Sequence, residues 1–101
     1  MSKSTPADLA VAFRSLARRR REAVDAAEGA AVTDLLGQLD QHVTAAATLV
    51  GSPPDADAVA DVLTGRPADE WDDTTLDAVR GHATQAGSVL RRVTEAGPGD
   101  A

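Results

Sequence analysis

The chain has 101 residues, a formal net charge of −6, no cysteine and only two aromatic side chains, Phe13 and Trp71. These features exclude a disulfide framework and a thiolate metal site, and the acidic balance argues against nucleic acid as a partner. The length fits one domain, and the abundance of alanine favours helices. Residues with AT-rich codons, such as Ile and Asn, are absent or rare, which indicates a bacterial gene of high GC content.

A first helix is predicted over residues 5–28, after a flexible tail at residues 1–4. Thr5 can cap the helix, and Pro6 suits its first position. Apolar residues follow at steps of three and four, and Gly29 marks the end. These residues are Leu9, Phe13, Leu16, Val24 and Ala27.

A second helix is predicted to end at Gly51. Its apolar stripe comprises Val32, Leu35, Leu36, Leu39, Val43, Ala46, Ala47 and Val50. The stripes of the first two helices lie roughly 115° apart on a helical projection, so a straight rod would not present one face. A turn or a sharp kink near residues 29–31 is therefore expected, and the sequence leaves both alternatives open.

Two further helices are predicted beyond Gly51. Asp55 begins a short one that ends at Gly65, and residues 68–72 form a turn that brings Trp71 onto the core. Asp73 or Thr74 caps the last helix, whose seam alternates steps of three and four like a coiled coil. Gly81, Ala83, Ala86 and Gly87 are expected to let a neighbouring helix approach closely, and the alternative is that the two glycines only weaken an exposed face. The seam residues are Leu76, Val79, Ala83, Ala86, Leu90 and Val93.

These elements predict an all-α fold. It is a small antiparallel bundle of three to four helices, with a short third helix and a coiled-coil-like last helix. Residues 5–96 form one domain, and residues 97–101 form a flexible tail.

The arginines of the first helix are the main candidates for a binding surface. Arg14, Arg18 and Arg21 share one face. This face could bind a phosphate or an acidic partner, or it could simply be exposed to solvent. Arg20 falls on the apolar stripe, where it either extends to the rim, meets a carboxylate or serves an interface.

An acidic belt and Trp71 are the other candidates. The belt could attract the arginine face, within one chain or between two, and Trp71 is either a core residue or an interface anchor. Thr74 and Arg80 stand where a calcium loop needs glycine and glutamate, so calcium is not expected. The belt comprises Asp55, Asp57, Asp61, Asp69, Glu70, Asp72, Asp73 and Asp77.

No catalytic, cofactor-binding or metal-binding residue is predicted, and the chain is not expected to be an enzyme. His42 and His82 lack the glutamate three residues earlier that helical-bundle metal motifs carry, and they are interpreted as boundary residues. Neither a nucleophile elbow nor a phosphate-cradling glycine loop is present.

The sequence therefore predicts a protein–protein interaction or assembly domain of unknown pathway. A homodimer is favoured by the thin core, although the sequence does not settle the oligomeric state. The alternative is a nucleic-acid or phosphate-binding module that uses the arginine face. The N-terminus lacks a signal pattern and no apolar run is long enough to span a membrane, so a cytoplasmic location is expected.

Overall fold

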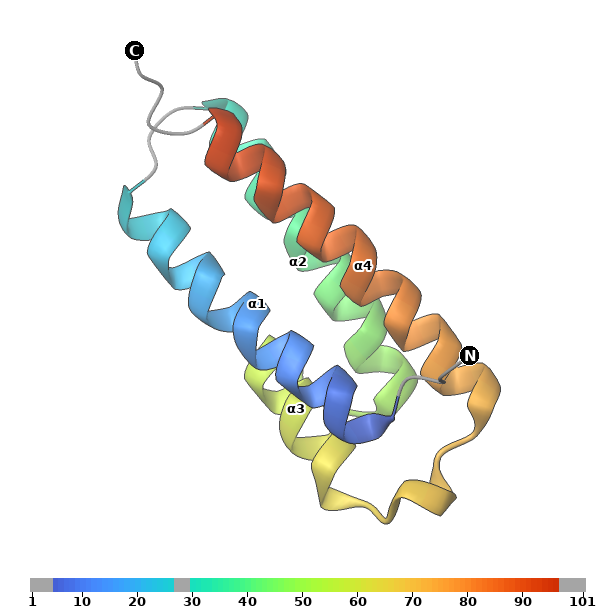
Figure 1. Cartoon of the computed structure of the whole chain (residues 1–101). Helices are drawn as coiled ribbons and strands as arrows, with labels where there is room; N and C mark the ends of the chain where they lie inside the picture. Colours follow the sequence, from blue (N-terminus) through green and yellow to red (C-terminus); the bar gives the residue numbers. More distant parts are fainter. Residues whose placement is uncertain (1–4, 27–29, 97–101) are drawn as a thin grey trace.

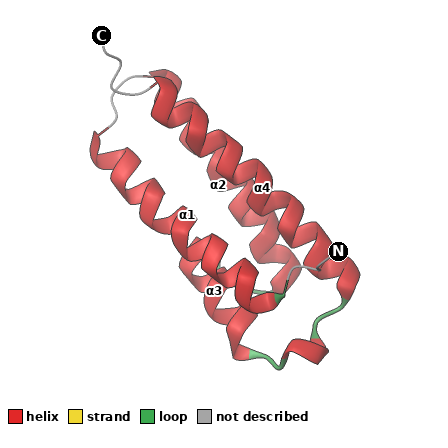
Figure 2. Cartoon of the chain, in the orientation of Figure 1, coloured by secondary structure: helices red, strands yellow, loops and turns green. Residues whose placement is uncertain are grey.

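The fold is a small all-α bundle, seen in a computed structural model that describes residues 5–26 and 30–96. Its helices are α1 (Pro6–Ala26), α2 (Ala30–Val50), the short α3 (Ala56–Gly65) and α4 (Asp73–Ala96), with a 3₁₀ turn, η1, at Ala68–Glu70. Figure 2 shows helices joined by short loops and no strand in this part of the chain. The predicted fold class, including the short third helix, is confirmed.

The helices form two antiparallel pairs. The most extensive contact joins α2 to α4, and the next joins α1 to α3. α1 also packs on α4, so one core connects the two pairs. The seam of α4 therefore faces helices of its own chain. None of the described helices is both long and apolar enough to cross a membrane.

The first two helices are separate, because α1 and α2 run in opposite directions (Figure 1). The predicted end of the first helix at residues 28–29 lies outside the described residues, as do both predicted tails. α4 begins at Asp73, so the position before its first turn is Asp72 rather than the predicted Asp73 or Thr74. The first backbone hydrogen bond of α4 accordingly runs from the Leu76 N–H to the Asp72 carbonyl, at 2.9 Å.

Local capping explains where two helices start. The Thr5 hydroxyl accepts a hydrogen bond from the Asp8 N–H at 3.1 Å. The Asp55 carboxylate accepts one from the Ala58 N–H at 3.0 Å. Each bond satisfies a donor that the first turn of a helix leaves unpaired.

Most of the predicted apolar stripes are buried in one cluster. The largest fully buried side chains come from all four helices, and they are Phe13, Leu39, Leu63, Leu90, Val50, Val59 and Val79. Val24 is the main exception, because 47% of its surface is exposed. The sequence placed Val24 in the core stripe, and this is wrong because α3 is too short to cover the end of α1.

The glycines of α4 do not serve the predicted close approach. A Cβ atom built at Gly81 or Gly87 would meet nothing within 4 Å among the described residues. The alanines grouped with them do pack inside the bundle, since Ala86 is fully buried and Ala83 packs against the core. The prediction failed because the apolar stripe gives the direction of a helix face but not its distance from a neighbour.

Candidate interaction surface

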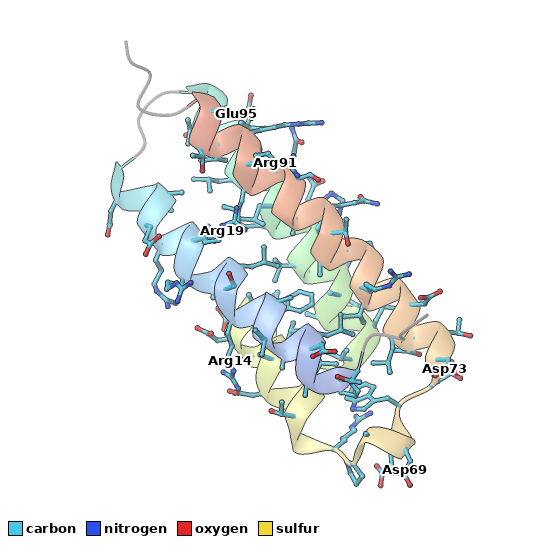
Figure 3. The ribbon with its side chains drawn as sticks, viewed as in Figure 1. Arg14, Arg19, Asp69, Asp73, Arg91 and Glu95 are labelled. Atoms are coloured by element: carbon cyan, nitrogen blue, oxygen red, sulfur yellow. The ribbon has the colours of Figure 1, made fainter. Side chains whose placement is uncertain are left out.

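Part of the arginine face of α1 is occupied by α3. Arg14 Nη2 donates to Asp61 Oδ1 at 2.9 Å, and Arg21 Nη1 donates to Asp57 Oδ2 at 3.3 Å. Figure 3 shows Arg14 on the side of α1 that lies against α3. Two members of the acidic belt thus pair with the arginine face within one chain, which is one of the two arrangements considered from the sequence.

Arg18 lies on the same face but is exposed and makes no ion pair with any described residue. Of the three arginines that the sequence placed together, it alone is without a carboxylate partner in this part of the chain. The pairs of Arg14 and Arg21 are exposed, so each contributes no more than about 1 kcal/mol.

Arg20 meets a carboxylate from α2. Its Nε donates to Asp40 Oδ1 at 2.8 Å, and its Nη2 donates to Asp40 Oδ2 at 2.9 Å. This two-bond geometry raises the pKa of Arg20 above its ordinary value, chiefly through the hydrogen bond to Asp40 and against a smaller effect of burial. The sequence offered three readings of Arg20, and the structure shows the carboxylate contact.

Trp71 lies in the core. Only 7% of its surface is exposed, and its Nε1 donates a hydrogen bond to the Leu63 carbonyl at 3.2 Å. The Arg66 guanidinium covers the ring at 4.7 Å from its centroid, a cation–π contact. η1 brings the ring to this position, as the sequence predicted, and Trp71 closes the end of the bundle between α3 and α4.

A groove opens between α1 and α2 at the start of α3. α3 has 10 residues, against 21 in each of α1 and α2 and 24 in α4. A four-helix arrangement therefore exists only along part of the bundle (Figure 1). The groove has a volume of about 450 Å³, within the range of small-molecule pockets.

The α1–α2 groove has an apolar floor and a charged rim. The floor includes Leu16, Leu39 and Val43, and the rim carries both signs of charge. The lining residues are Leu16, Ala17, Arg20, Arg21, Leu39, Asp40, Val43, Thr44, Pro54, Asp55 and Ala56. The sequence identified both arginines of the rim as candidates for a binding surface. It did not predict the groove, because the position of the groove depends on where α3 starts.

The acidic belt is not gathered into one site. Within residues 5–26 and 30–96, no three His, Cys, Asp or Glu side chains come close enough together to hold a metal ion. No family model, curated protein or solved structure matches this chain. The fold defines the class, a small all-helical bundle, and the α1–α2 groove is the surface on which a function can be argued.

Proposed function

We propose that this chain is a small helical assembly domain that pairs with a second copy of itself through the α1–α2 groove. The observation that supports the proposal is that α3 covers only part of the length of α1 and α2. Beyond the start of α3, the place that a fourth helix would take beside α1 and α2 is not filled. A helix or a helix pair from a second copy would complete the four-helix packing there.

Apolar side chains at and beside the groove favour association. Leu16, Leu39 and Val43 line the groove but are themselves nearly buried, so the exposed apolar surface comes mainly from Val24, one turn further along α1. Burying such surface contributes about 25 cal/mol per Å², and a thin, alanine-rich core leaves much to gain. Association with a second copy also stabilises the folded state by mass action.

The charges on the rim favour a copy of the same chain as the partner. A symmetric dimer places one patch against itself, so a patch of a single sign would repel its mate. The rim of the groove carries Arg20 and Arg21 together with Asp40 and Asp55. Because Arg20 already bonds Asp40 and Arg21 already bonds Asp57 within the chain, the patch is close to neutral and does not repel the same patch on a second copy, despite the net charge of −6.

The alternative, phosphate or nucleic-acid binding by the arginine face, has less support. Arg14 and Arg21 already donate to Asp61 and Asp57, and a phosphate would have to displace those carboxylates. We therefore advance the assembly function alone.

The test is a charged side chain placed in the groove. Thr44 is exposed and lines the groove, so Thr44→Arg should block a second copy without disturbing the fold, because arginine is a good helix former. Thr84→Arg is the matched control, since Thr84 is an exposed threonine of α4 outside the groove.

Light scattering after gel filtration should show a dimer for Thr84→Arg and a monomer for Thr44→Arg. Circular dichroism would establish that both variants remain helical. Dimers of equal stability in the two variants would overturn the proposed role of the groove.

A further inference from the structure

The two histidines of the chain meet between α2 and α4. The ring centroids of His42 and His82 lie 5.7 Å apart, with the ring planes at 40°. Both residues are half-buried. They are 40 positions apart in the sequence, and the antiparallel packing of the two helices brings them together.

One ring nitrogen in this contact is unsatisfied. Nδ1 of His82 is buried and has no hydrogen-bond partner among the described residues. A buried polar atom without a partner destabilises the folded state, and such an atom in a native protein calls for an explanation. A group that bonds to this imidazole would remove the penalty.

We propose that His42 and His82 form a binding site for a divalent transition-metal ion of the Zn²⁺ type, which links α2 to α4. A Zn–N bond is about 2.0–2.1 Å long, so two imidazoles on one tetrahedral zinc ion have centroids about 5 Å apart. The observed separation of 5.7 Å is close to that distance, and a small side-chain rotation would close the difference.

The chemistry of the pair selects the class of metal. Neutral imidazole suits zinc, nickel and copper, whereas magnesium and calcium prefer oxygen ligands. The chain has no cysteine, so it offers no thiolate ligand to a transition metal. Its only imidazole ligands are the two histidines of this pair. No third candidate ligand is grouped with them in the described residues, so the two imidazoles would be the only ligands that this part of the chain supplies to the ion.

The site is independent of the proposed assembly function. Thr44 is two residues from His42, which places it on the opposite side of α2 from the histidine contact. Failure of the groove to bind a second copy would therefore leave the metal proposal intact, and the reverse also holds.

The first experiment uses the unmodified chain, freed of metal with a chelator and titrated with zinc chloride. Proton NMR resolves the Cε1–H resonance of each histidine ring. We expect both resonances to shift together and to saturate at one zinc ion per chain. A shift of one ring alone, or of neither, would overturn the proposal. Saturation at one zinc per two chains would do the same, because the metal would then be shared between copies.

The second experiment compares variants by calorimetric titration. His42→Gln and His82→Gln should each weaken zinc binding at least about tenfold. Asp69→Asn is the control for adventitious binding by the acidic surface, and it should bind zinc as the unmodified chain does. Magnesium chloride should give no binding to the pair. Equal zinc affinity in the unmodified chain and both histidine variants would contradict the proposal.

Discussion

Arg20 of α1 holds Asp40 of α2 through two hydrogen bonds, of 2.8 and 2.9 Å, and so ties together two helices that otherwise contact each other little. A guanidinium is charged throughout the ordinary pH range in any case, and this contact raises the pKa of Arg20 further. A raised pKa means that the stabilisation is fully present below the unfolded-state pKa of arginine. Through the titration of Arg20 itself, it is lost as the pH rises through the still higher folded-state pKa.

We predict a measurable but modest coupling between these two residues. The side chains are 41% and 49% exposed, so solvent screens the pair. A double-mutant cycle with Arg20→Ala and Asp40→Ala, followed by urea unfolding, should give a coupling free energy of about 0.5–1 kcal/mol. The singly bonded Arg14–Asp61 pair should give less. Additive effects of the two substitutions would show that the Arg20–Asp40 contact does not stabilise the fold.

Trp71→Ala should destabilise the protein by about 3–5 kcal/mol, because it removes a large buried ring. Trp71→Phe keeps much of the apolar volume but leaves the Leu63 carbonyl without its donor, so its cost should be smaller. Thermal melting followed by circular dichroism measures both. A melting temperature unchanged by Trp71→Ala would mean that the ring is not part of the core.

Two leucines of α2 make a matched test of the core. Leu39 is 1% exposed and Leu49 is 42% exposed. Leu39→Ala should cost about 2–5 kcal/mol in the free energy of unfolding, and Leu49→Ala less than about 1 kcal/mol. Equal effects, measured by urea unfolding, would place the buried face of α2 elsewhere.

Replacing the glycines of α4 with alanine should stabilise the protein. A Cβ atom at Gly81 or Gly87 meets nothing within 4 Å, and alanine favours a helix over glycine. Each change to alanine should therefore raise the free energy of unfolding by about 0.5–1 kcal/mol. Gly51→Ala is the contrast, since Gly51 has φ of 77° and alanine there should destabilise by about 1–2 kcal/mol. A loss of stability at Gly87 would indicate a close neighbour that the fold does not show.

The fold was largely predictable because apolar spacing and capping residues are local signals. Thr5 caps the helix that it was expected to cap, α3 starts directly after its predicted start signal, and Gly51 ends α2 with a positive φ. The wrong predictions concerned side-chain burial and the distance between helices, which depend on the lengths and positions of several helices together. Val24 follows the helical spacing of a core residue, but its burial depends on how far α3 extends.

The candidate surface was less predictable for the same reason. The arginines were visible in the sequence, but their partners Asp40, Asp57 and Asp61 depend on which helices are neighbours. The histidines carried no signal, because no local motif connects position 42 to position 82. Contacts between helices, rather than residue types, decide which of these side chains can act together.

The mass of the unmodified chain in solution tests the central claim most directly. Light scattering after gel filtration, at about 0.15 M salt and from about 10 µM to 1 mM protein, covers the affinities expected for a small interface. Self-association through the α1–α2 groove predicts a concentration-dependent rise from 10.4 kDa toward twice that value. A mass that stays at 10.4 kDa over the whole range would contradict the assembly function.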